Sequence, residues 1–275
     1  MWTLTGFADE IDPDLEIQLR TLAEEGIGHL ELRGVWDKNV LDLSDDEVGR
    51  VAGAIAAAGV RVSAIGSPIG KIGIGEPFGP HRARFGRALD VAQRLEAPFV
   101  RIFSFFVPEG DDPARHREAV LDRLGHLVRA AEGSGVTLLH ENEKGIYGDT
   151  PARCHDLLST IGSPTLRAAW DPANFVQVGV RPHDEGYALL RPFVAYLHVK
   201  DAARATGEVV TAGAGDGQVR ETVTALHASG FAGFCSLEPH LQSAGPFSGF
   251  SGPALFRAAA AAFKDVLREQ GIGWE

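Results

Sequence analysis

The sequence predicts one (β/α)8 TIM barrel that spans residues 1–275 as a single domain. Its length of 275 residues is normal for one such barrel. Short β-rich segments alternate with longer amphipathic segments, and the pair recurs eight times along the chain. Glycine follows several of the amphipathic segments. Parallel strands joined by helices form right-handed units, and eight such units close into a barrel.

The strand segments are short runs rich in β-branched and aromatic residues. Because each is followed by a helical pattern, we expect all of them to run parallel in one sheet. The expected strands are Leu4–Ala8, His29–Arg33, Val60–Ile65, Phe99–Ser104, Val136–Glu141, Leu166–Asp171, Val194–Val199 and Gly233–Glu238.

The helical segments repeat apolar residues with a period near 3.6, as Leu15, Leu19 and Leu22 do. Glycine is the usual residue just past a helix end. We expect helices at Leu15–Glu25, Asp45–Ala58, His81–Leu95 and Pro113–Glu132, and glycine caps at Gly26, Gly59, Gly135 and Gly230. A doubly wound open sheet is the alternative fold, but the first strand is not followed by a Gly-x-Gly-x-x-Gly turn.

Composition limits the classes of partner. The chain has 37 acidic and 26 basic residues, a net charge of −11, which counts against nucleic acid as a partner. Its two cysteines, Cys154 and Cys235, cannot form a Cys-x-x-Cys site or a disulfide framework, and we expect them in a helix and in the last strand. The opening MWTLTGFADEIDPD lacks the basic start of a signal peptide, and no apolar run is long enough to cross a membrane. These features predict a soluble, cytoplasmic protein.

The last four expected strands end in LLHEN, AAWDPAN, YLHVKD and SLEPH. Active sites of such barrels lie at the carboxyl ends of the strands, so these ends should meet. They would bring together Glu141, Asp171, His198 and Glu238. A single acid there is more often a helix cap, but acids on successive strands would repel one another without a cation. Three carboxylates and an imidazole suit one divalent ion, such as Mn²⁺, Co²⁺ or Mg²⁺, with Zn²⁺ as a further option.

The segments HENEKGIYGDT, WDPANF, LHVKDA and SLEPHL resemble the xylose-isomerase-like barrel superfamily of sugar-phosphate isomerases and epimerases. The resemblance extends to FADEI, ELRGVWDKNVLDLS and GSPIGKI, and so covers nearly the whole chain. In the ketose 3-epimerases of that superfamily, a Glu, Asp, His and Glu from strands five to eight bind Mn²⁺ or a similar ion. The resemblance therefore implies Mn²⁺ as the first expectation for this site, and possible homo-oligomers.

The resemblance also implies substrate-binding residues. The epimerases have a substrate-binding Arg six residues after the metal-binding His, and Arg204 has that spacing. Three residues after the Asp they use His, where this chain has Asn174, and six residues after the first Glu they use Glu, where it has Tyr147. From the two-residue period of a strand we add Lys200 and His240, which follow His198 and Glu238, as residues that face the substrate.

The two glutamates match the acid–base pair of the epimerases. A metal that binds a ketone and a neighbouring hydroxyl stabilises an enediolate, while one carboxylate removes a carbon-bound proton and another group returns one. We therefore expect a metal-dependent isomerase or epimerase of a keto sugar or its derivative, with Glu141 and Glu238 as catalytic residues. Two alternatives stay open. One is an endonuclease-IV-like phosphodiesterase, which needs further metal ligands on strands one to four, and the other is a metal-dependent lyase of 3-keto glycosides.

Other segments bear on the pocket. GSPIGKIGIG lacks the Gly-Lys-Ser/Thr ending of a phosphate-binding loop, so we expect a mobile loop over the pocket. TAGAGDG is expected to be a flexible turn. The aromatic residues that could form apolar walls of the pocket, or equally pack in the core, are Trp36, Phe105, Phe106 and Phe175.

Overall fold

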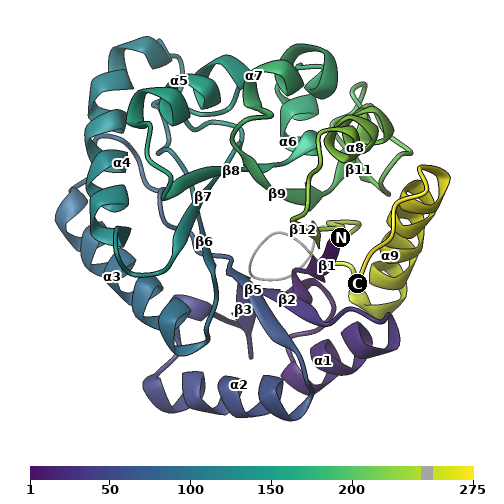
Figure 1. Ribbon diagram of the computed structural model, residues 1–275. Helices are drawn as coiled ribbons and strands as arrows, with labels where there is room; N and C mark the ends of the chain where they lie inside the picture. Colours follow the sequence, from purple (N-terminus) through teal and green to yellow (C-terminus); the bar gives the residue numbers. More distant parts are fainter. Residues whose placement is uncertain (243–249) are drawn as a thin grey trace.

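In the computed structural model, which describes residues 1–242 and 250–275, eight parallel strands form one sheet that curls into a barrel (Figure 1). These strands are β1 (Thr3–Gly6), β2 (His29–Leu32), β5 (Arg61–Ile65), β6 (Phe99–Ile102), β7 (Thr137–Glu141), β8 (Leu166–Trp170), β9 (Val194–Val199) and β12 (Phe234–Leu237). Their order in the sheet is β1-β12-β9-β8-β7-β6-β5-β2. A parallel bridge between Phe7 and Glu31 joins the two end strands. The predicted (β/α)8 barrel is confirmed.

Helices surround the strands on the outside of the barrel (Figure 1). They are α1 (Leu15–Glu24), α2 (Asp45–Ala57), α3 (Phe78–Arg94), α4 (Arg117–Ala131), α5 (Pro151–Ile161), α6 (Pro172–Gln177), α7 (Ala188–Leu190), α8 (Val219–Ala228) and α9 (Gly252–Glu269). Short 3-10 turns are η1 (Ala8–Glu10), η2 (Val40–Asp42) and η3 (Pro113–His116), and η4 (Pro182–Tyr187) is a π-helical turn. Two small hairpins pair β3 (Gly34–Val35) with β4 (Lys38–Asn39) and β10 (Asp201–Ala202) with β11 (Val209–Val210).

Local sequence explains most of the helix boundaries. Ser44 and Glu47 form a reciprocal capping box at the start of α2. Of the expected glycine caps, Gly26, Gly59 and Gly230 lie just past helix ends with positive φ angles (66° at Gly59), whereas α4 ends at Ala131, four residues before Gly135. Two predicted starts were wrong. Helix α3 begins at Phe78, before the expected His81, and Pro113 opens the 3-10 turn η3, so that α4 begins only at Arg117.

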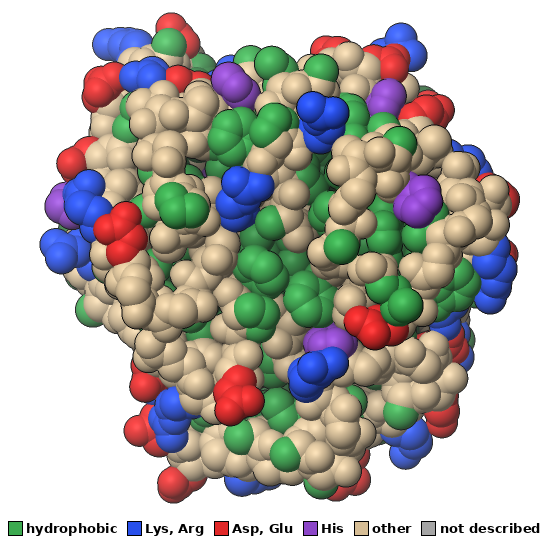
Figure 2. All heavy atoms as spheres, in the orientation of Figure 1, with side chains coloured by type: hydrophobic (Ala, Val, Ile, Leu, Met, Phe, Trp, Pro, Cys, Tyr) green, Lys and Arg blue, Asp and Glu red, His purple; other side chains and the backbone are tan. Residues whose placement is uncertain are grey.

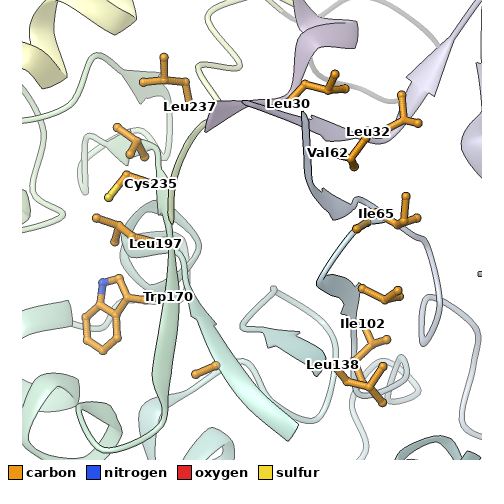
Figure 3. Packing of buried hydrophobic residues seen from close by; sticks show 14 of the residues in the cluster. Leu30, Leu32, Val62, Ile65, Ile102, Leu138, Trp170, Leu197, Cys235 and Leu237 are labelled. Carbon is orange, nitrogen blue, oxygen red and sulfur yellow. The ribbon is translucent and has the colours of Figure 1, made fainter. Parts of the chain in front are cut away.

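The strands send alternate side chains outward and inward. The outward side chains form the main apolar core against the helices, and Figure 3 shows Leu30, Val62 and Trp170 pointing away from the barrel interior. Cys154 in α5 and Cys235 in β12 are buried and unpaired, as expected. Charged side chains lie mainly around the rim of the face in Figure 2, with hydrophobic ones nearer its middle.

The inward side chains fill the barrel with a mixed apolar and polar column. Leu139, Ala169 and Tyr196 form a small apolar cluster there. The Ser63 hydroxyl lies 2.7 Å from the Thr5 hydroxyl and 2.9 Å from that of Tyr196. The next inward positions toward the carboxyl ends of the strands hold charged groups, so the barrel interior becomes polar where the expected site begins.

Candidate metal centre

Strand periodicity places the four expected ligands at one end of the barrel. Glu141 is the last residue of β7, and His198 is an inward residue near the end of β9. Asp171 and Glu238 directly follow β8 and β12. The four strands are neighbours and parallel, so these ends lie side by side. All four side chains are buried.

The structure brings the four side chains together, because one ligand atom of each lies within 4.8 Å of the others. His198 Nδ1 is 3.1 Å from Glu141 Oε1 and 3.6 Å from Glu238 Oε2. Lys200 completes the group, with its Nζ 2.7 Å from Asp171 Oδ2. The three carboxylates and one imidazole of Glu141, Asp171, His198 and Glu238 are the donor set expected of a site for one divalent ion.

Neighbouring groups hold the carboxylates in place. The Asn174 backbone N–H donates to Asp171 Oδ1 at 2.9 Å, and the Asn174 amide donates to Glu141 Oε1 at 3.3 Å. Arg101 Nη1 lies 3.2 Å from Glu141 Oε2, and Arg33 Nη1 lies 3.6 Å from Glu238 Oε1. The outer oxygens of the two glutamates, Glu141 Oε2 and Glu238 Oε1, are therefore paired with arginines. The inner oxygens, Glu141 Oε1 and Glu238 Oε2, face His198.

The charge of the buried cluster supports a cation. Around the barrel end, the buried carboxylates of Glu10, Glu31, Glu141, Asp171 and Glu238 outnumber the buried cations Arg33, Arg101 and Lys200, even when a protonated His198 is counted with them. Among the described residues, His198 Nδ1 makes no aligned hydrogen bond, although it lies 3.1 Å from Glu141 Oε1 and 3.6 Å from Glu238 Oε2. A buried excess of negative charge is costly unless a cation compensates it. The residues present therefore fit one divalent metal ion.

The pKa shifts follow from burial and from these neighbours. Burial raises the pKa of Asp171 to about 7, against the lowering effect of the Lys200 ammonium. For Glu141 the effect of burial is outweighed by His198 and Arg101, and its pKa falls to about 2. The neighbouring carboxylates Glu141 and Glu31 overcome burial at His198 and raise its pKa well above the usual value. All three shifts thus have the same two causes, burial and the charges of neighbouring groups in the cluster.

A cavity of about 760 Å³ opens next to the cluster. Asn174, Lys200 and His240, three of the four residues expected to contact substrate, line it. Its outer wall includes Phe106, Glu143, Lys71 and Lys144, and the Lys71 ammonium lies 3.0 Å from Glu143. Lys71 belongs to GSPIGKIGIG, so that segment does border the pocket.

The fourth expected substrate residue, Arg204, does not line this cavity. Its guanidinium donates to the carbonyls of Gly179 and Val180 at 3.0 and 2.9 Å, and it borders a different surface hollow. Sequence spacing gives the position of Arg204 on the chain but not the direction of its long side chain.

Other expected residues also take different positions. Tyr147 is buried, and its hydroxyl donates to Asp156 rather than facing the cluster. Phe105 and Phe175 pack in the core, and Trp36 stacks with Arg50, so among the aromatic residues considered only Phe106 lines the cavity. Bulky aromatic side chains suit the core as well as a pocket wall, and here Phe105 and Phe175 lie in the core with Trp36 packed against it.

Glu10 was missed by the sequence reasoning. It is fully buried, and it accepts the His240 backbone N–H at 2.7 Å. The His240 ring Nδ1 lies 2.9 Å from Glu10 Oε1, so Glu10, Glu238 and His240 form a second set of possible ligands. The guanidinium of Arg33 already lies 3.6 Å from Glu10 and from Glu238 and supplies positive charge to this set. The only sequence signal for Glu10 was its position as an acid just after the first strand, in FADE.

The model of the xylose isomerase-like TIM barrel family matches residues 19–266, and the chain belongs to that family. It is 28% identical over 222 residues to the 2-epi-5-epi-valiolone 7-phosphate 2-epimerase of an Actinoplanes species, which covers 77% of each chain.

Solved structures share the fold at lower identity. A D-tagatose 3-epimerase-like protein has a TM-score of 0.79 at 16% identity, over 98% of both chains. A xylose isomerase-like TIM barrel protein from Mycobacterium smegmatis, in complex with magnesium, has a TM-score of 0.70 at 19% identity, over 96% of this chain and 97% of that one. Across residues 1–242 and 250–275, no helix is long and apolar enough to span a membrane.

Proposed function

We propose that this chain is a divalent-metal-dependent isomerase or epimerase that acts on a keto sugar or a keto-sugar derivative through an enediolate. The observation that carries the proposal is the pair Glu141 and Glu238, whose carboxylates approach the same nitrogen, His198 Nδ1, from β7 and from the end of β12. The Actinoplanes relative is named as an epimerase, which agrees with this reaction class.

Glu141, Asp171, His198 and Glu238 would hold the ion. When bound, a divalent cation polarises a carbonyl and stabilises the negative charge of the enediolate. Mn²⁺ is our first expectation, with Co²⁺, Mg²⁺ or Zn²⁺ as alternatives; the barrel from M. smegmatis contains magnesium.

The protein's own residues would move the proton. One of Glu141 and Glu238 removes a proton from the carbon next to the carbonyl, and the other returns one to the opposite face. Arg101 and Arg33 fix the outer oxygens of the two glutamates, so that the inner oxygens stay directed at the site. Burial of the cluster excludes water, which protects an enediolate from unwanted protonation.

Substrate hydroxyls would be bound by Asn174, Lys200 and His240, which connect the cluster with the cavity. The relative's substrate is a 7-phosphate, so phosphorylated keto sugars fall within the proposed range. Arg204 is better explained as a residue that fixes the 177–181 segment, because its donors are already used by two backbone carbonyls.

Two measurements test the proposal. Elemental analysis of protein purified without chelator should find about one divalent ion per chain, and added Mn²⁺ should raise the melting temperature of chelated protein, since a ligand of the folded state stabilises it. A panel of keto sugars and their phosphates, D-tagatose included, is then incubated in D₂O. Turnover should place deuterium at the inverted carbon, and Glu238→Gln with metal still bound should stop it.

Three results would contradict the proposal: no metal and no thermal shift, unlabelled product, or full activity of Glu238→Gln. A hydride-shift isomerase would transfer hydrogen directly and leave the product unlabelled. Metal content must be measured on the same mutant sample, because Glu238 is also a proposed ligand.

A further inference from the structure

Glu31 is a buried carboxylate that the proposed reaction does not use. It lies in β2, has 0% exposure, and neither of its carboxylate oxygens makes an aligned hydrogen bond among the described residues. Its Oε2 lies 3.4 Å from His198 Nε2. Burying a carboxylate costs free energy, so the negative charge of Glu31 in the middle of the barrel needs a compensating partner.

The His198 ring has a fixed orientation between its neighbours. Phe7 and Tyr196 pack against it edge to face, with ring centroids 5.3 and 5.7 Å away. Held in this way, Nδ1 faces Glu141 and Glu238 while Nε2 faces Glu31. The two nitrogens of the same ring therefore meet two different carboxylate environments.

Tyr196 lies beside the same carboxylate. The Tyr196 hydroxyl lies 2.9 Å from the Ser63 hydroxyl, so it has a hydrogen-bonding partner apart from Glu31. His198 is then the neighbour whose chemistry Glu31 can change.

An imidazole that binds a metal through one nitrogen carries its proton on the other, and that proton needs an acceptor. We propose that Glu31 is this acceptor: it holds the proton on His198 Nε2, turns Nδ1 toward the metal, and increases the basicity of the ring. Glu31 is thus a positioning residue that acts through His198. The inference rests on the proposed metal centre, and it adds a residue from the opposite half of the barrel.

The test compares Glu31→Leu and Glu31→Gln with Glu143→Gln. Leucine removes the acceptor, whereas glutamine keeps an acceptor oxygen and loses only the charge. Glu143 borders the cavity and pairs with Lys71, so its variant removes one nearby charge without touching His198. Zn²⁺ affinity is measured by competition with a chelator. In parallel, NMR of the zinc-loaded, ¹⁵N-histidine-labelled protein follows the Nε2–H signal of His198.

In wild-type protein we expect a slowly exchanging, downfield Nε2–H signal. Glu31→Leu should weaken Zn²⁺ binding about 10–100-fold and lose that protected signal. Glu31→Gln should fall between Leu and wild type, and Glu143→Gln should stay within about twofold of wild type, as a change outside the ligand shell should. A purely structural role of Glu31 would lower the melting temperature of the metal-free protein without this graded response.

Wild-type affinity and an unchanged Nε2–H signal in Glu31→Leu would overturn the inference. If the leucine variant does not fold, Glu31→Gln decides: unchanged zinc affinity and unchanged exchange of the Nε2–H proton would overturn it. Failure of the wild-type protein to bind Zn²⁺, Mn²⁺ or Mg²⁺ would instead overturn the proposed function, so the two failures are distinct.

Discussion

The Lys200 ammonium lies 2.7 Å from Asp171 Oδ2 and 3.2 Å from Glu238 Oε2, so it contacts two of the four candidate metal ligands. A metal ion bound at the proposed site would therefore share these carboxylates with the ammonium. Because Lys200 also lines the cavity, its side chain has space to turn toward a substrate.

Lys200→Met should therefore strengthen Mn²⁺ binding by about tenfold, since a positive charge next to the ion is removed. The same change should lower the melting temperature of metal-free protein, because the carboxylates lose their counter-charge. Calorimetric titration and thermal unfolding measure the two effects. Lys144→Met is the matched control, because Lys144 lines the same cavity but donates to the Gln177 amide. Weaker Mn²⁺ binding in Lys200→Met would show that the lysine supports the ligands instead.

Asp201 holds the glycine-rich segment 211–217. Its carboxylate accepts the backbone N–H groups of Ala202, Gly213, Gly215 and Gly217 at 2.8–3.0 Å. A Cβ at Gly215 would lie 2.5 Å from Asp201 Oδ1, which explains the glycine there. The expected flexible turn is thus held by three of these hydrogen bonds, from Gly213, Gly215 and Gly217.

We expect Asp201→Ala to lower the free energy of unfolding by about 3 kcal/mol, because it leaves several donors without an acceptor. Asp201→Asn, which keeps one acceptor oxygen, should lose less. Urea unfolding of both variants measures the difference. Equal stability of Asp201→Ala and wild type would mean that water replaces the carboxylate without cost.

His81 fixes the loop that carries Lys71. The Gly70 backbone N–H donates to His81 Nε2 at 2.7 Å, which requires the neutral ring. Burial, followed by Arg84 and Arg123, lowers the pKa of His81. A lowered histidine pKa stabilises the fold above the unfolded value of about 6.5, and this contribution is lost as the pH falls below it.

As the pH falls from 7 to 5, wild-type protein should lose more unfolding free energy than His81→Gln, whose amide oxygen accepts the same N–H without titrating. Chemical unfolding at several pH values provides the comparison. Parallel pH profiles for the two proteins would remove His81 from this account.

Variants of Arg204 and Asn174 should distinguish a residue that stabilises the fold from one that contributes to substrate binding. Arg204→Ala should cost about 1 kcal/mol of stability through two lost hydrogen bonds, and should leave KM within about twofold. Asn174→Ala removes contacts to Glu141 and to the Asn142 carbonyl and exposes the cavity floor, so kcat/KM should fall at least about tenfold. Steady-state kinetics on the identified substrate and thermal unfolding decide. A large KM effect of Arg204→Ala would restore it as a substrate residue.

The barrel could be predicted because strand and helix periods are local properties of the chain. The approach of Glu141, Asp171, His198 and Glu238 could be predicted as well, since a two-residue period and a parallel sheet place strand ends at one level. The helix starts at His81 and Pro113 were wrong, because a proline permits a helix start nearby without determining the residue at which it begins.

The number and direction of the strands and the chemical type of the candidate ligands could thus be predicted from the pattern of residues. The neighbours of those ligands depend on the folded chain, in which Glu31 reaches the site from β2, Arg33 from the end of β2 and Arg101 from β6. In the folded chain the Arg204 side chain also points to the Gly179 carbonyl and not to the cavity, and Glu10 lies against His240. The physical reason is that a strand period gives the side of the barrel on which a residue lies. The direction of a long side chain, in contrast, depends on charges and packing contributed by other segments of the chain, such as Gly179 and Val180 for Arg204 and Glu10 for His240.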